Sequence, residues 1–323
     1  MLYRNILGMI AVVVCFCTSQ ESWAGGAWVP KAGDGMIQLG FSRKTADVVW
    51  DAKGNVFQSK NAAGDTHYHD FRYSYLTGEV GVVKNTSFTF VFTYLWGFEG
   101  YRSTGLEKNF GFSDAWLGAK YQFREGAWPM AVRVNLRSPF LYNQPGPYTR
   151  HLYHKGSFRL PGTQRVVPDT TFFVMSNPEW RGLNKKDLTI AYAVSHSFLK
   201  FSGWMVVDAG YTFREGAPAD EIPVYGEFAY LLPVGSFAPH IKAGFSLVKS
   251  VGNNSPSDES DRFNFPPGFS YDFNDASMLR GSISLLWLIN QGQWFAEVGY
   301  GQWLWGRGAR QYKEPFLSVG RGF

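Results

Sequence analysis

Apolar and polar residues alternate along most of the chain, so that short segments have one apolar face and one polar face. The plainest example is TSFTFVFTYLWGF at 86–98, where an aromatic residue stands at every second position. An alternation with a period of two predicts a β-strand. From Phe88 to Phe98 a strand tilted by about 40° rises about 25 Å, which is close to the height of the apolar band of an outer-membrane barrel.

The same alternation predicts about twelve strands. Short connections near 84–85, 124–128, 200–203, 233–236 and 290–293 alternate with longer ones at 47–66, 99–111, 138–186, 215–222, 250–275 and 305–314. Outer-membrane barrels show this alternation, with tight periplasmic turns and long outer loops. We therefore predict an all-β fold, a transmembrane antiparallel up-and-down β-barrel of about 12 strands (range about 10 to 14), with a long extracellular loop at about 138–186. The predicted strands are 35–42, 69–76, 86–98, 114–123, 130–137, 187–194, 204–213, 225–232, 240–247, 280–289, 294–300 and 315–323.

The start of the chain has the pattern of a secretory signal. One Arg is followed by an apolar run from Ile6 to Cys17 and a small-x-small site that ends at Ala24. This order predicts a cleaved signal peptide at 1–24 and a barrel at 25–323. Cys15 and Cys17 are the only cysteines, so the mature chain should contain no disulfide, catalytic thiol or cysteine-ligated zinc.

Composition separates a membrane barrel from a soluble sheet. Aromatic residues make up 18% of the chain, and no apolar run after the signal is long enough for a helical membrane span. A half-exposed soluble sheet would also alternate, but it would have to pack all the aromatic faces into one core. In a membrane barrel these aromatic faces contact lipid and need no second sheet to pack against. The formal charge of +5 is too small to indicate a nucleic-acid partner.

The polar faces of the strands should line the lumen. With Asp70 and Asp187 included, the charges on these faces balance in sign. Two interpretations stay open: a polar wall around a hydrated path, or a ladder of paired charges that fills the barrel. Eight strands leave room only for side chains and sixteen leave an aqueous channel, so twelve falls between. The residues that we expect along a solute path are Arg72, Asp114, Lys120, Arg133, Asn135, Arg137, Asp208, Glu227, Lys242, Arg280 and Glu297.

The longest loop is basic between Asn143 and Pro168, where it has no Asp or Glu. Folded over the mouth of the barrel, it would attract anions. The alternative is that its basic residues bind the phosphates of lipopolysaccharide or stay solvated. These residues are Arg150, His151, His154, Lys155, Arg159 and Arg165.

Two segments carry a resemblance to a known family: GAWVPKAGDGMIQLGFS at 26–42 and GYTFREGAPADEI at 210–222. They resemble the proteobacterial outer-membrane transporters of the type named for the MetA pathway of phenol degradation, which include barrels encoded with exopolysaccharide genes. The resemblance implies a passive channel or uptake role. The last strand, with Leu317, Val319 and Phe323 on one face, resembles the signature that the barrel assembly machinery recognises, although Arg321 interrupts that face.

We find no pattern that predicts catalysis or metal binding. HLYH at 151–154 has two His but no nearby carboxylate to complete a metal site. SHS at 195–197 lacks the His-x-Ser-Asn-Gly pattern of membrane-barrel phospholipases, and adjacent His196 and Ser197 point to opposite sides of a strand. We therefore expect no enzyme activity and no cofactor.

The predicted function is a passive channel or facilitator for a small solute in the Gram-negative outer membrane. Its expected partners are outer-membrane lipid, lipopolysaccharide and the barrel assembly machinery. One alternative is an exopolysaccharide-export barrel in which Trp116, Trp204 and Tyr225 stack on sugars. The other is a non-conducting structural or adhesion barrel whose loops bind a partner.

Overall fold

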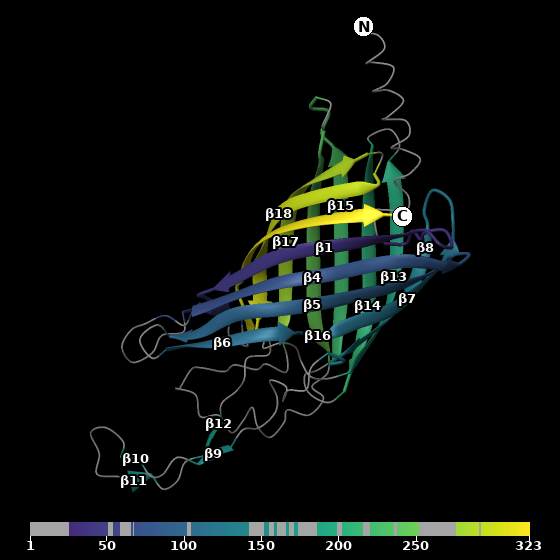
Figure 1. The fold of residues 1–323 in the computed structure, drawn as a ribbon. Coiled ribbons are helices and arrows are strands. Elements are labelled where there is room, and N and C mark those ends of the chain that lie inside the picture. Colours follow the sequence, from purple (N-terminus) through teal and green to yellow (C-terminus); the bar gives the residue numbers. More distant parts are fainter. Residues whose placement is uncertain are drawn as a thin grey trace.

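Long antiparallel strands close into a barrel in the computed structural model of the chain (Figure 1). The structure describes residues 26–50, 54–58, 66, 68–101, 105–141, 152–154, 158–159, 166–167, 171–173, 186–198, 202–215, 220–235, 238–251, 276–290 and 292–323. The predicted signal peptide at 1–24 lies outside these residues. Within them, no helix has the length and apolar character needed to cross a membrane.

Each strand of the wall pairs with the next wall strand in the chain, and the last pairs back with the first. β6 (Gly105–Phe112) and β7 (Ala115–Arg124) both pair with β5, so they form two parts of one wall strand. The predicted all-β, up-and-down barrel of twelve strands is confirmed. The other wall strands are β1 (Gly35–Ala46), β4 (Tyr68–Val83), β5 (Thr86–Tyr101), β8 (Met130–Ser138), β13 (Asp187–Phe198), β14 (Gly203–Arg214), β15 (Asp220–Leu231), β16 (His240–Val251), β17 (Ser277–Ile289), β18 (Trp294–Arg307) and β20 (Lys313–Gly322).

The two ends of the barrel differ in their connections. The connections between β4 and β5, β7 and β8, β13 and β14, β15 and β16, and β17 and β18 lie at one end, which we call the short-turn end. Four of them have two to five residues, and the one between Leu231 and His240 has eight. Asn85 and Asn290 adopt positive φ angles of 61° and 51° in two of these turns, a conformation that Asn tolerates better than most residues. The opposite end is the long-loop end.

Short strands occupy the predicted long loops. β2 (Val49–Trp50) pairs with both β3 (Val56–Phe57) and β19 (Ala309–Arg310). Within the loop at 138–186, β9 (Leu152–His154) pairs with β12 (Thr171–Phe173), and β10 (Phe158–Arg159) pairs with β11 (Val166–Val167).

Two of the predicted loops are largely strand. β5 continues to Tyr101 and its ladder with β6 runs from Tyr94 opposite Phe112 to Tyr101 opposite Gly105, so most of 99–111 belongs to the wall. In the same way β18 continues to Arg307, inside the predicted loop at 305–314. In these stretches the neighbouring strand satisfies the backbone groups and extends the ladder beyond the predicted strand ends.

The predicted apolar faces are the outer faces on every wall strand except β4. Side chains such as Leu39, Phe228 and Ile283 are 43%, 49% and 54% exposed on the outside of the barrel. Arg321, which interrupts the apolar face of the last strand, lies with its guanidinium 5.2 Å from the ring centroid of Trp294 near the short-turn end. A cation over an indole ring is a favourable arrangement.

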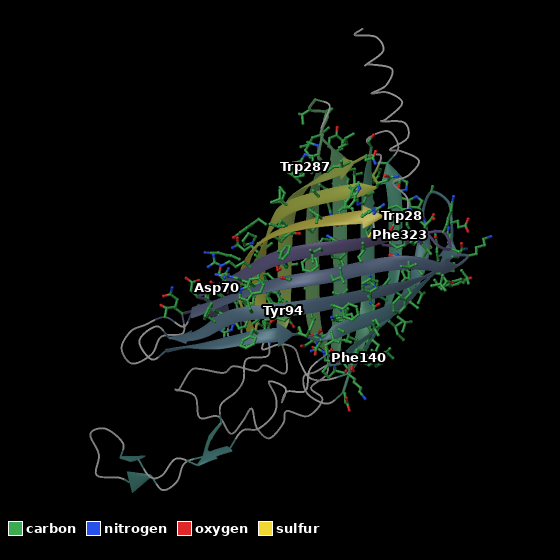
Figure 2. All side chains as sticks on the ribbon, viewed as in Figure 1. Trp28, Asp70, Tyr94, Phe140, Trp287 and Phe323 are labelled. Atoms are coloured by element: carbon green, nitrogen blue, oxygen red, sulfur yellow. The ribbon has the colours of Figure 1, made fainter. Side chains whose placement is uncertain are left out.

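On β4 the two faces are reversed, so the predicted lumen position of Arg72 is wrong. Arg72 stands directly opposite Arg43 and Trp96, on the outer face. Asp70 shares this face and accepts two hydrogen bonds from Arg43, at 2.8 Å from Nε and 2.7 Å from Nη2. Figure 2 shows Asp70 near the long-loop end and Phe323 near the opposite one.

The aromatic residues of β4 point inward because glycines on both neighbouring strands leave room for them. Tyr75 stands opposite Gly40 of β1, and Phe71 stands opposite Gly97 of β5. A Cβ atom at Gly40 would collide with the Tyr75 ring, and one at Gly97 would lie 2.6 Å from the Phe71 ring. The fit of ring to glycine therefore fixes which face of β4 is inside.

Candidate functional site

Charged side chains on the inner wall form the candidate site, and nearly all of them are paired. Apart from Arg72, the predicted path residues lie on or beside the inner face. Their part in a solute path stays a prediction. They are Asp114, Lys120, Arg133, Asn135, Arg137, Asp208, Glu227, Lys242, Arg280 and Glu297.

A chain of ion pairs crosses five neighbouring strands at the long-loop end. Arg137 contacts Asp114 at 2.6 Å and Asp187 at 3.8 Å. Arg214 contacts the same Asp187 at 3.4 Å and Glu221 at 2.8 Å. Asp187 is fully buried. Each cation thus sits between two carboxylates, which neutralises charges that would otherwise be costly to desolvate.

Two further pairs lie deeper on the wall. The Lys120 side chain is only 3% exposed, and its ammonium contacts Glu79 at 2.7 Å. The Ser87 hydroxyl donates to the same carboxylate at 2.6 Å. Arg133 contacts Asp208 at 3.0 Å. These pairs support the interpretation of the lumen as a ladder of paired charges over much of its wall.

A third group of charged inner-wall side chains surrounds a cavity of about 220 Å³. Lys242 lies between Glu227 at 3.0 Å and Glu297 at 3.2 Å. Glu227 also accepts hydrogen bonds from the Tyr225 hydroxyl at 2.6 Å and from the Trp204 indole at 2.8 Å. The lining residues are Ser42, Tyr75, Tyr225, Glu227, Lys242, Gly244, Arg280, Ser282, Ser284, Glu297, Glu314 and Phe316.

Arg280 holds the other side of this cavity. Its Nε donates to Glu314 at 2.9 Å, and its guanidinium lies 5.5 Å from the Trp303 ring and 5.9 Å from the Phe316 ring. Gly301 stands beside the guanidinium, where a Cβ atom would lie 2.7 Å from its central carbon. The cavity therefore has a rigid wall in which an arginine is fixed by one carboxylate and two rings.

Residues Gly26–Asp34, which we call the N-terminal segment, enter the lumen at the short-turn end. The backbone N–H of Ala27 donates to the Ser195 hydroxyl at 2.8 Å, and Lys120 Nζ donates to the Gly26 carbonyl at 3.1 Å. Gly26 has a φ of 65°, and a Cβ atom there would collide with Ser195. The segment is therefore bonded to inward-facing side chains of β7 and β13.

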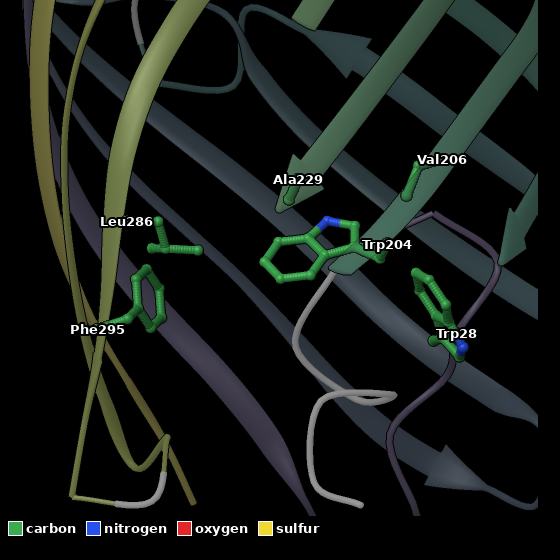
Figure 3. Close-up of a cluster of buried hydrophobic side chains, with 6 residues drawn as sticks. All are labelled: Trp28, Trp204, Val206, Ala229, Leu286 and Phe295. Atoms are coloured by element: carbon green, nitrogen blue, oxygen red, sulfur yellow. The ribbon is translucent and has the colours of Figure 1, made fainter. Parts of the chain in front are cut away.

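Trp28 anchors the N-terminal segment in an apolar cluster on the inner wall (Figure 3). Its indole is 6% exposed and belongs to a cluster with Trp204, Val206, Ala229, Leu286 and Phe295. Ala27 is fully buried and packs with Ala131 and Ala193. Trp28 belongs to the segment 26–42 that carries the family resemblance, and it packs in the same cluster as Trp204.

A second apolar cluster lies near the long-loop end, formed by Ala46, Trp50, Trp303, Ala309 and Tyr312. The cavity is connected to both clusters. Trp204 of the first cluster bonds Glu227, and Trp303 of the second lies against Arg280. A polar cavity thus stands between two apolar clusters inside the barrel.

Other sequence predictions fall outside this site. In the basic loop, Arg150, His151, Lys155 and Arg165 lie outside the described residues, and His154 and Arg159 are described only as parts of β9 and β10. The His196 ring stacks on Trp128 with centroids 4.2 Å apart, on the outer face. Within the described part of the chain, no three His, Cys, Asp or Glu side chains gather into a possible metal site.

Several inner-wall residues of the site do not follow from the sequence pattern. Glu79 and Tyr75 were hidden by the reversed faces of β4. Glu314 precedes Pro315 in a stretch interpreted as loop. The signal for Glu79 was present, since Leu76, Val80 and Val82 alternate with Thr77 and Glu79 when the strand is followed to its end.

Solved structures, rather than sequences, provide the comparison with known proteins. No protein-family model matches the chain, and no curated protein resembles it in sequence. The chain is similar to the COG4313 outer membrane channel from Pseudomonas putida F1, with 10% identity and a TM-score of 0.58 over 91% of this chain and 97% of that one. It also matches the CymD monoaromatic hydrocarbon channel (10% identity, TM-score 0.42, 90% of this chain and 89% of that one) and the translocator domain of the autotransporter NalP from Neisseria meningitidis (8% identity, TM-score 0.40, 99% and 95%). The similarity to the COG4313 channel shows that the chain has the fold of an outer-membrane β-barrel.

Proposed function

We propose that this protein is a passive channel or facilitator for a small solute in the Gram-negative outer membrane, without enzyme activity. One observation carries the proposal: a polar cavity lies inside a closed barrel whose outer surface is apolar. Such a barrel offers a solute a route that avoids the hydrocarbon of the membrane. The fold shared with the COG4313 channel supports the architecture, and the resemblance to the MetA-pathway transporters supports an uptake role.

The outer face supports the membrane location. The alternating aromatic side chains of β5 run along it, with Phe88 41% and Tyr94 38% exposed. Exposed apolar surface of this extent is unfavourable in water at about 25 cal/mol per Å² and favourable in lipid. With this placement the short-turn end faces the periplasm and the long-loop end faces outward.

The N-terminal segment stands on the proposed route. The segment and its Trp28 anchor lie against the inner wall at the short-turn end, toward which a solute would leave the cavity. We therefore expect conduction to depend on how firmly the segment is held.

Planar-bilayer recording of the purified full chain tests the proposal. We expect discrete single-channel steps, and we expect larger steps from a variant that lacks residues 26–31, because it leaves the short-turn end less filled. A matched control replaces Trp128, which is 43% exposed on the outer face, by Ala and should conduct like the unmodified chain. Absence of steps from both the full chain and the shortened variant would reject a channel.

The same recording decides on the non-conducting alternative, which the paired charges and the N-terminal segment favour. The structure supports an exopolysaccharide-export role less than a channel for a small solute. Of the aromatic residues proposed to stack on sugars, Tyr225 lines the cavity, whereas Trp204 packs in the cluster with Trp28, and the ring of Trp116 lies 5.3 Å from the Arg137 guanidinium.

A further inference from the structure

The lining of the cavity has a charge balance that disfavours one class of solute. The carboxylates of Glu227, Glu297 and Glu314 face the cations of Lys242 and Arg280. Every one of these five groups forms a salt bridge with another of the five. Because carboxylates outnumber cations, an added anion meets net repulsion.

The salt bridges leave several polar atoms available to a ligand. Arg280 bonds Glu314 through Nε, and among the described residues its two η nitrogens have no hydrogen-bond partner. The same holds, within the described part of the chain, for the second carboxylate oxygens of Glu297 and Glu314 and for the hydroxyl groups of Ser42 and Tyr75. Donors and acceptors are therefore offered side by side.

Aromatic rings complete the lining. Tyr75, Tyr225 and Phe316 border the cavity, and ring faces pack well against C–H groups. A polyhydroxylated ring uses all of these features at once, because its hydroxyls can bond the guanidinium and the carboxylates while its C–H face lies on a ring. An apolar ring would cover the charged atoms without bonding them, which is costly.

We infer that this cavity is a binding subsite for a polyhydroxylated solute without negative charge, of the size of one sugar ring. The volume of about 220 Å³ equals that of about seven water molecules at about 30 Å³ each. The inference rests on the proposed channel function and names the solute class of that site.

Calorimetric titration of the full chain in detergent tests the inference, with D-glucose, D-glucuronate and phenol as probes. Glucose and glucuronate share a ring and differ in a carboxylate. Glucose should bind saturably, glucuronate at least about tenfold more weakly because of the excess carboxylate, and phenol without saturation. Replacing Tyr75 by Phe removes one lining hydroxyl and should weaken glucose binding about fivefold. Tyr300→Phe, on the outer face and 41% exposed, is the matched control and should change nothing.

Three results would overturn the inference: glucuronate that binds as tightly as glucose, saturable phenol binding with none for glucose, or glucose binding that Tyr75→Phe leaves unchanged. Ion conductance judges the channel separately. Ionic steps without glucose binding reject the sugar subsite and leave the channel standing. Glucose binding without ionic steps supports the subsite and rejects the channel.

Discussion

At the scale of single residues, buried ion pairs decide which changes the inner wall tolerates. Lys120 and Glu79 are 3% and 11% exposed, and their pair is reinforced by the Ser87 hydroxyl. A charge removed from water is costly, and only its partner offsets that cost. Loss of one partner is therefore more harmful than loss of both.

We predict that Glu79→Ala lowers the free energy of unfolding by about 3–5 kcal/mol, because it leaves the Lys120 ammonium buried without its carboxylate. Urea unfolding in lipid vesicles measures the change. A double variant, Glu79→Gln with Lys120→Gln, removes both charges and should recover much of the loss. Glu125→Ala, in the exposed turn after β7, is the control. Equal effects of Glu79→Ala and Glu125→Ala would contradict the role given to the pair.

At the scale of elements, the N-terminal segment combines two kinds of anchor. Hydrogen bonds from Lys120 and to Ser195 fix its backbone, and the Trp28 indole fixes its position in the apolar cluster. Truncation of a buried aromatic residue to Ala costs about 3–5 kcal/mol. Part of this free energy holds the N-terminal segment against the wall. For each 1.4 kcal/mol of it that is lost, the fraction of molecules with a displaced segment rises about tenfold.

We predict that Trp28→Ala raises the fraction of time that single channels spend in their largest conductance state by more than about tenfold. The measurement is single-channel recording under the conditions used for the unmodified chain. Trp128→Ala, a Trp on the outer face at the same end of the barrel, serves as the matched control. An unchanged open fraction in Trp28→Ala would show that the segment does not limit conduction.

The elements predicted from sequence share a cause. A strand with one outward face and one lumen face needs apolar residues on the first and polar residues on the second. The sequence therefore alternates, as Leu188 and Ile190 do with Asp187 and Thr189. For this reason the twelve strands and most of their faces follow from the pattern alone. Most inner-wall charges follow with them, including Lys242 and Arg280.

What sequence did not predict depends on contacts between distant parts of the chain. Tyr75 has an apolar ring and a polar hydroxyl, so it could face either lipid or the lumen. Gly40 on the next strand leaves room for its ring inside the barrel. Trp28 stands in a short segment without periodicity, and its burial depends on Trp204 in the middle of the chain. The partners of the inner-wall charges likewise follow from strand register, which alternation alone does not give.

At the scale of the whole molecule, the inner wall is close to electrically balanced. Nearly every cation on it is within 4 Å of a carboxylate, and Lys44 instead lies 4.7 Å and 5.1 Å from the rings of Tyr73 and Trp303. The fields of such pairs cancel over short distances, and salt screens the remainder. A strong preference for ions of one sign is therefore not expected from the wall.

We predict that the permeabilities for K⁺ and Cl⁻ differ by less than about threefold in a salt gradient. The reversal potential measures the ratio. Glu314→Gln, which removes the partner of Arg280, should shift it toward Cl⁻. A strong preference for Cl⁻ in the unmodified chain would contradict control by the wall and would point to the basic loop that contains Arg150 and Lys155.

The closing seam of the barrel also determines when the barrel can close during folding. β1 and β20 come from opposite ends of the chain, and the bond from Gln38 to Ser318 joins residues 280 positions apart. Pairing over such a separation is slow, and the edge of β1 stays unpaired until β20 joins it. An open edge is a template for other chains. A product that stops before residue 313 would therefore be prone to aggregate rather than to form a smaller barrel.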